Sequence, residues 1–158
     1  MIIGVTGHRP AKLGGYKVPN NTYKFVMAET AKIVAECKPD KIITGMCIGY
    51  DQWVAQLAIK LKIPFIAAIP FVGQELLWPK DTQAHYQDLL AYAEQVEVVS
   101  PGAFASWKMQ ARNQWIVNNS DLIIGAFDGS KGGTYNCLEY SKEMNKKIRT
   151  INPLEVKS

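Results

Sequence analysis

The side chains best suited to chemistry in this sequence follow its first run of apolar residues. Ile2–Thr6 is almost entirely apolar, and Gly7, His8 and Arg9 come directly after it. Arginine presents a planar fork of donors that suits a phosphate, and histidine can donate, accept or titrate near neutral pH. We therefore interpret His8 and Arg9 as candidate contacts for an anionic ligand, with structural hydrogen bonding or solvent exposure as the alternative. Gly7 could serve the ligand or only a tight turn.

A second polar cluster follows the apolar run Lys41–Thr44. Gly45 and Gly49 would let the backbone approach a ligand closely, and Asp51 stands where a helical pattern begins. The free N–H groups and positive dipole end of such a helix favour an anion. Three roles stay open for Asp51: capping the helix, binding a ribose hydroxyl, or activating a water molecule.

A third cluster repeats this arrangement after the apolar run Asp121–Phe127. Gly132 and Gly133 open the backbone, Thr134 offers a hydroxyl, and a helical pattern follows. We interpret this turn as the phosphate-binding element. The chain has neither a G-x-x-x-x-G-K-[ST] loop nor a G-x-G-x-x-G fingerprint, which disfavours the nucleotide-binding classes that depend on them.

Three further residues could either contact the ligand or have a purely structural role. Arg112 and Asn113 lie in a helical stretch, on roughly the same face as Met109 and Ile116. A buried guanidinium must be paired, so Arg112 is expected either in a structural network with a carboxylate or at the ligand. Trp78 could stack on a base or anchor its loop to the core.

The elements that position these clusters are apolar runs alternating with helical patterns. Runs that are apolar on both faces are typical of parallel strands covered by helices. The pattern predicts an α/β, Rossmann-like, doubly wound and mostly parallel sheet of five to six strands with helices on both faces, as a single domain over residues 1–158. All three clusters then fall at the carboxyl ends of strands, where ligands bind in such sheets. The predicted strands are Ile2–Thr6, Lys41–Thr44, Pro64–Phe71, Val96–Ser100, Asp121–Phe127 and Ile148–Ile151, and the predicted helices are Tyr23–Cys37, Gln52–Lys62, Thr82–Glu94, Lys108–Asn118 and Thr134–Lys146.

Composition narrows the class of protein and its compartment. Of 158 residues, 47% are apolar and 20% charged, which is ordinary for a globular domain. The net charge of +4 suits phosphates but is small for a dedicated nucleic-acid binder. Cys37, Cys47 and Cys137 have no metal-binding or disulfide spacing, so we expect no metal, no cofactor and a cytoplasmic protein. No stretch is long and apolar enough for a membrane span.

The ordered set of motifs resembles the YspA/YpsA-like branch of the SLOG superfamily, the Rossmann-like proteins grouped around DprA and the LOG phosphoribohydrolases. The likeness covers nearly the whole chain. It rests on Gly7–Pro10 with Lys12–Tyr16, on Thr44–Asp51, on Arg112 with Asn113, and on Gly132–Thr134. The resemblance implies a nucleotide or nucleotide-derived ligand at the carboxyl edge of the sheet, with the Gly-Gly-Thr turn near its phosphate, and a homo-oligomer.

One departure from the LOG pattern bears on catalysis. LOG-type hydrolases carry Pro-Gly-Gly-x-Gly-Thr-x-x-Glu, whose Glu acts at the glycosidic bond with help from an arginine that Arg112 matches by position. Here Cys137 stands where that Glu would be, and the nearest acid is Glu139. A shift of two residues rotates a helical side chain by about 200°. Only Asp51, Glu75 or Asp128 could replace the missing acid.

Three functions follow as hypotheses. The first is a sensor or sequestering protein that binds a nucleotide or nucleotide-derived signalling molecule without turnover. The alternative is an N-glycosidic hydrolase of nucleoside monophosphates or NAD-like compounds, with Asp51 and Arg112 as its catalytic residues, so whether the chain is an enzyme stays open. Single-stranded nucleic-acid binding requires a basic track with stacking aromatic residues, and it is disfavoured because the chain lacks a strong excess of positive charge.

Overall fold

The protein is described by a computed structural model that covers residues 1–156. Its strands are β1 (Ile2–Gly7), β2 (Lys41–Thr44), β3 (Phe65–Ile69), β4 (Gln95–Val98), β5 (Leu122–Ala126) and β6 (Lys147–Ile151). Its helices are α1 (Asn21–Cys37), α2 (Tyr50–Leu61), α3 (Lys80–Ala91), α4 (Trp107–Asn118) and α5 (Gly133–Glu143), with short 3-10 turns at Pro10–Lys12 and Pro153–Glu155. No helix within residues 1–156 is both long and apolar enough to cross a bilayer.

The strands form one sheet in the order β4-β3-β2-β1-β5-β6, in which every neighbouring pair is parallel. The inner strands β3 and β5 are buried at every residue, as expected of strands with helices on both sides. The edge strands are largely exposed, and β6 carries Lys147 and Arg149 toward solvent. Charged residues on an edge discourage pairing with another sheet. The predicted α/β, doubly wound fold is confirmed.

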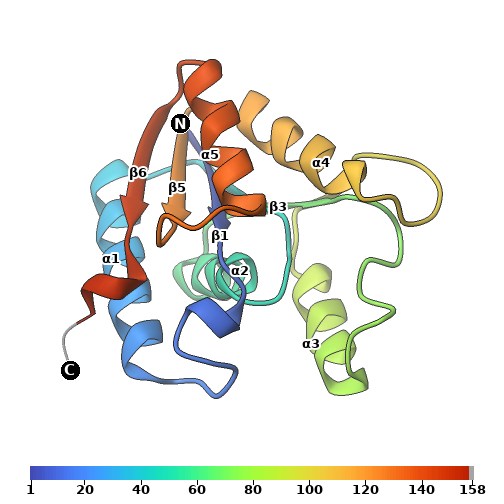
Figure 1. Ribbon diagram of the computed structural model, residues 1–158, viewed down its shortest axis with the longest axis horizontal. Coiled ribbons are helices and arrows are strands. Elements are labelled where there is room, and N and C mark those ends of the chain that lie inside the picture. The colour runs from blue at the N-terminus through green and yellow to red at the C-terminus, as the bar shows by residue number, and fades with distance from the viewer. Residues whose placement is uncertain (157–158) are drawn as a thin grey trace.

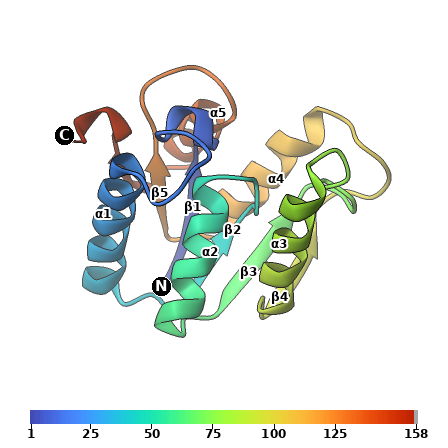
Figure 2. The ribbon, with the colours of Figure 1, turned by 90° about the horizontal axis from the view of Figure 1, so that it is seen from below.

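Helices cover the sheet on both sides. Figures 1 and 2 show α1, α2 and α3 over one face and α4 and α5 over the other. The chain therefore leaves β1 toward one face and its neighbour β5 toward the other. Such a reversal between adjacent parallel strands opens a crevice at their carboxyl ends. Figure 2 shows the loops that follow β1 and β5 at this end of the sheet.

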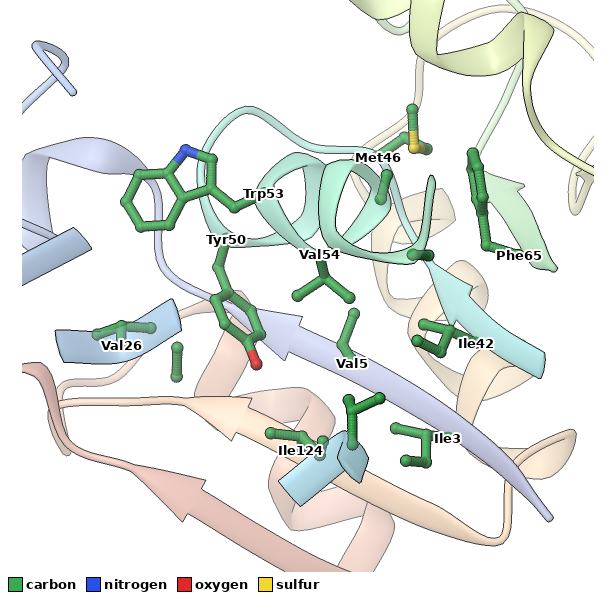
Figure 3. Close-up of a cluster of buried hydrophobic side chains, with 14 of the residues drawn as sticks. Ile3, Val5, Val26, Ile42, Met46, Tyr50, Trp53, Val54, Phe65 and Ile124 are labelled. Atoms are coloured by element: carbon green, nitrogen blue, oxygen red, sulfur yellow. The ribbon is translucent and has the colours of Figure 1, made fainter. Parts of the chain in front are cut away.

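The larger core lies between the sheet and α1–α3 (Figure 3). Ile3, Val5 and Ile124 of the central strands pack there with Tyr50 and Val54 of α2, and each is at most 1% exposed. The other face is packed by smaller clusters under α4 and α5. Helices fixed to the sheet on both sides give the loops at its carboxyl edge a rigid support.

The predicted elements are all present, but several of their ends differ. The helix predicted from Gln52 begins two residues earlier, at Tyr50. The strand predicted over Pro64–Phe71 ends at Ile69, because Pro70 has no N–H to donate to the next strand. The helix predicted to reach Lys146 ends at Glu143, before the left-handed Asn145 (φ 56°). Apolar patterns locate elements better than they locate ends.

Candidate functional site

A cleft of about 470 Å³ opens where the chain leaves β1 and β5. We call it the β1/β5 cleft. Its walls come from the loop after β1, the turn before α2, the inner face of α4 and the first turn of α5. It is lined by Thr6, Gly7, His8, Arg9, Ala11, Lys12, Cys47, Asp51, Met109, Arg112, Asn113, Gly132, Gly133 and Thr134.

A histidine and a carboxylate join the loops after β1 and β5. His8 Nε2 lies 2.8 Å from Asp128 Oδ1 and 3.0 Å from the Asp128 backbone nitrogen. Ser130 donates to the same carboxylate oxygen from its hydroxyl and its N–H, and these bonds lower the pKa of Asp128 to about 2. Burial lowers the pKa of His8, although Asp128 opposes the shift. At neutral pH we therefore assign an ionised Asp128 and an uncharged His8 ring, whose Nε2 either donates to the carboxylate or accepts the Asp128 N–H, according to the tautomer.

Two cations of the same loop stand at the mouth of the cleft. Lys12 Nζ donates to Ser130 Oγ over 2.6 Å, which ties the β1 loop to the β5 loop. The Arg9 side chain is exposed, and it lies near enough to Asp51 to favour the charged form of that carboxyl. Both cations line the cleft, so an anion that enters meets positive charge first.

Asp51 is the acid that reaches the interior of the cleft. It is the second residue of α2 and only 7% exposed. Its Oδ2 accepts a 3.3 Å bond from the Cys47 N–H, whereas its buried Oδ1 has no partner within residues 1–156. Burial raises the pKa of Asp51 to about 6, although Arg112 opposes the shift. Of the three roles left open for Asp51, capping is excluded, because the N-cap residue of α2 is Gly49.

Arg112 is a buried guanidinium whose partners are all uncharged groups. Nη1 donates to the Gly45 carbonyl over 2.8 Å, Nη2 to Cys47 Sγ over 3.4 Å, and Nε to Asn113 Oδ1 over 3.1 Å. Among the described residues, no carboxylate lies within ion-pair distance of it, so the expected network with a carboxylate is absent. Burial works against its charge, but the nearby Cys47 and Asp51 leave its pKa raised. With three bonds made from five N–H donors, Arg112 retains donors for an anion.

The space beside the glycines of the turn before α2 is occupied by other parts of the protein. A Cβ at Gly45 would lie 2.5 Å from Arg112 Nη1, and one at Gly49 (φ 107°) would lie 2.7 Å from the His8 carbonyl oxygen. A Cβ at Gly7 would lie 2.4 Å from the Tyr50 ring. These glycines allow close packing behind the cleft, and neither Gly45 nor Gly49 lines it. Met46 between them is left-handed at φ 63°, which is uncommon for a residue with a side chain.

The space beside the glycines of the turn before α5 is unoccupied by the described part of the chain. A Cβ at Gly132 or Gly133 would meet nothing within 4 Å among residues 1–156. Gly132 is the N-cap, with φ 154° and no side chain capping the helix. The first N–H groups of an α-helix have no partner within the helix, so those of Gly133 and Thr134 are available at the cleft. Asn113 Nδ2 supports the turn by donating to the Gly133 carbonyl over 3.4 Å.

The motifs and their arrangement decide the family. A model of the YspA SLOG family matches residues 3–157. The chain belongs to the YspA SLOG family. It is 32% identical over 135 residues to the uncharacterized SPbeta prophage-derived protein YoqJ of Bacillus subtilis (strain 168), a match that covers 75% of this chain and 78% of YoqJ.

Solved structures similar to this family member include two DNA processing proteins. DprA from Streptococcus pneumoniae has a TM-score of 0.67 at 19% identity, over 95% of this chain and 50% of that chain. DprA from Helicobacter pylori, described as binding single-stranded DNA, has a TM-score of 0.68 at 16% identity, over 96% of this chain and 65% of that chain. The chain thus spans only half to two thirds of these proteins. At such identities the likeness shows a shared fold.

Not every residue predicted for the SLOG-type site reaches the cleft. Trp78 lies elsewhere, with its ring against Tyr86 at 5.2 Å between centroids, as expected of a loop anchor. Gly45 and Gly49 lie behind the cleft wall. The predicted residues that do line it are Gly7, His8, Arg9, Asp51, Arg112, Asn113, Gly132, Gly133 and Thr134.

Of the acids that could replace the LOG-type Glu, only Asp51 lines the cleft. Glu139 is half-exposed and pairs with Lys142 at 3.0 Å, as the rotation around α5 predicts. Cys137 is 1% exposed, and burial raises its pKa to about 11. Glu75 is a buried residue of the loop between β3 and α3, where it accepts from Gln87, outside the cleft.

Sequence reasoning missed several residues that line the cleft. Lys12 and Cys47 stand inside the quoted motifs, but neither was singled out as a site residue. Thr6 and Met109 were assigned to a strand and to a helix face. Cys47 lies three positions after the end of β2, a signal that could have identified it, because the carboxyl ends of the strands meet at this edge. Lys12 lies five positions after the end of β1, beyond the reach of that signal.

Proposed function

We propose that the β1/β5 cleft binds a nucleotide or nucleotide-derived molecule through its phosphate, and that the protein holds this ligand as a sensor or sequestering protein. A cleft of about 470 Å³ is within the ordinary range for small-molecule sites. The observation that carries the proposal is the buried Asp51 Oδ1 without a partner, in the same cleft as the uncapped start of α5.

The phosphate is assigned to the turn at Gly132–Thr134. The free N–H groups and dipole of α5 favour an anion there, and the empty space around both glycines lets the phosphate approach the backbone. Arg112 supplies charge from within, and Arg9 and Lys12 supply it from the mouth of the cleft. A buried guanidinium with only neutral partners gains most from an arriving anion.

The ribose is assigned to Asp51. A buried carboxylate oxygen without a partner costs about 1–3 kcal/mol or more, and a ligand hydroxyl that donates to it removes that cost. At neutral pH the carboxyl is mainly ionised, because its pKa is about 6. It therefore accepts hydrogen bonds, which suits the hydroxyls of a sugar.

One observation favours glycosidic hydrolysis as a second candidate. A carboxyl with a pKa of about 6 is poised to exchange a proton near neutral pH, as a general acid or base must. Asp51 also lies beside Arg112, which could hold the ligand during bond cleavage. The LOG-type Glu is absent, so any turnover would depend on Asp51.

The experiment is calorimetric titration with AMP, GMP, CMP, UMP and NAD, with each matching nucleoside as the control that lacks phosphate. We expect binding of at least one phosphorylated compound at micromolar Kd or tighter, and at least tenfold weaker binding of its nucleoside. Equal affinity for nucleoside and nucleotide, or no binding of any phosphorylated compound, would refute the assignment.

The same samples separate the alternatives. Chromatography after prolonged incubation would detect free base. Release of free base would show that the protein is a hydrolase and would refute the sensor proposal. A single-stranded oligonucleotide forms a third arm, prompted by the DNA-binding Helicobacter protein of similar fold. If the protein binds the oligonucleotide in preference to every mononucleotide, the proposed ligand is single-stranded nucleic acid and the mononucleotide proposal is refuted.

A further inference from the structure

Cys47 is a thiol inside the cleft that the proposed function does not use. It lines the β1/β5 cleft, is half-buried, and forms no disulfide. Its Sγ accepts a 3.4 Å hydrogen bond from Arg112 Nη2. This contact places the thiol beside a buried cation, in a cleft that Arg9 and Lys12 also line.

The other two cysteines have different surroundings and serve as internal references. Cys137 is 1% exposed beneath α5, and burial raises its pKa to about 11. Cys37 is half-buried in the last turn of α1, where it packs against the larger core and has no arginine as a hydrogen-bond partner within residues 1–156. Cys47 is the cysteine that combines access with a cationic partner.

A second observation supports ligand binding in this part of the cleft. The Cys47 N–H donates to Asp51 Oδ2, and the other oxygen of the same carboxyl, Oδ1, is buried and has no partner in the described part of the chain. Asp51 is only 7% exposed and lines the same cleft. The unpartnered carboxylate and the thiol therefore belong to neighbouring residues of one cleft.

We propose that Cys47 is a modification site for small anionic disulfides, and that the mixed disulfide excludes the nucleotide from the β1/β5 cleft. The exclusion rests on the proposed function, but the modification does not. Arg9, Lys12 and Arg112 line the cleft, so a carboxylate-bearing disulfide is attracted to the place where the thiol lies.

The reaction is ordinary thiol–disulfide exchange. The Cys47 thiol loses its proton to solvent, and Sγ attacks one sulfur of the reagent. A new S–S bond forms, the S–S bond of the reagent breaks, and the leaving sulfur departs as a thiolate with the electron pair. Cys47 is oxidised to the mixed disulfide, and half of the reagent is reduced, so no other oxidant is required.

The test compares two dialkyl disulfides of opposite charge, anionic dithiodipropionate and cationic cystamine, on the intact protein. Intact-mass time courses give the rates, and peptide mapping gives the site. We expect the first addition at Cys47, about tenfold or more faster with the anionic reagent, and a difference that shrinks at high salt. Cys137 should react only after unfolding.

Two variants control the assignment. Cys47→Ser should abolish the fast addition, whereas Cys37→Ser should leave its rate unchanged. Reaction of Cys37 at least as fast as Cys47, or equal rates with both reagents, would overturn the modification site.

Excess AMP should slow the fast addition at least fivefold, and the modified protein should no longer bind AMP. If AMP binds to the modified protein unchanged, the exclusion is refuted. If AMP does not bind even to the untreated protein, the nucleotide proposal fails, while the selectivity for Cys47 is still decided by the reagent rates.

Discussion

The two glycine turns at the rim of this sheet look alike in sequence and differ in what surrounds them. In the turn before α2, which we call the packed turn (residues 45–49), a Cβ at Gly45 or Gly49 would collide with Arg112 or with the His8 carbonyl. In the turn before α5, the open turn (residues 132–134), a Cβ at Gly132 or Gly133 would meet nothing within 4 Å among the described residues.

The difference separates two uses of glycine at one site. The packed turn uses glycine so that other parts of the protein can approach it, which fixes Arg112 and the β1 loop in place. The open turn keeps its backbone N–H groups accessible from the cleft. Preorganised donors next to unoccupied space are what a ligand-binding element requires. The comparison therefore gives the first turn a structural role and favours our proposal that the second turn contacts the ligand.

The substitution with the largest expected effect on stability lies in the packed turn. Gly49→Ala places a Cβ 2.7 Å from a backbone oxygen at a φ of 107°, so both a clash and backbone strain result. We expect the free energy of unfolding to fall by roughly 3 kcal/mol, measured by urea denaturation. The matched control is Gly133→Ala in the open turn, which should be neutral or slightly stabilising. Equal destabilisation by the two changes would remove the distinction between the turns.

The substitution with the next largest expected effect places a side chain in the open turn. Gly133→Val should fold with nearly wild-type stability, since the side chain enters empty space. It should weaken AMP binding on the order of a hundredfold, because the branched side chain occupies the position assigned to the phosphate. Calorimetry and thermal melting of the same sample supply both values. Wild-type affinity would show that the turn is only structural.

A third effect concerns the acid that adjoins the packed turn. Asp51 has a pKa of about 6 in the folded protein and 3.8 as its ordinary value, so the folded state takes up a proton first as pH falls. Wild-type protein should therefore gain about 2 kcal/mol of stability from Asp51 between pH 7 and pH 4.5.

Asp51→Asn should lose this gain, be more stable than wild type at pH 7, and bind AMP more weakly. Urea denaturation at the two pH values measures the difference between the proteins. The same pH dependence in both would show that Asp51 does not carry the shift.

The smallest expected effect is on AMP affinity, and it tests the role of the exposed Arg9. Arg9→Ala should leave the melting temperature unchanged and weaken AMP binding about tenfold, mostly at low salt, because an exposed charge is screened. Titrations at two salt concentrations test this. An unchanged affinity at both would exclude Arg9 from the site.

Much of the fold could be predicted from the sequence because its signals are local. Continuous apolar runs such as Leu122–Ala126 identify buried parallel strands, and their order along the chain predicts helices on both faces. The placement of polar clusters at strand ends predicts where a cleft should form. These inferences need only the residues of one segment at a time.

The rest depends on contacts between distant segments. Gly45 and Gly133 are equivalent in sequence, and only the arrival of Arg112 from α4, 67 residues away, fills the space beside Gly45. For the same reason Cys47 was not recognised as a cleft residue and Trp78 was assigned a ligand role as one alternative. Asp51 was considered as a cap because sequence does not show that Gly49 already begins the helix.

Backbone amide NMR of the ¹⁵N-labelled protein, titrated with AMP and with adenosine, tests the central claim most directly. We expect AMP to produce its largest shift changes at the N–H groups of Gly133 and Thr134, and adenosine to leave these two signals nearly unmoved. Largest changes near Gln56 and His85, which line a separate cavity of about 260 Å³, or equal effects of both compounds at the open turn, would contradict the account.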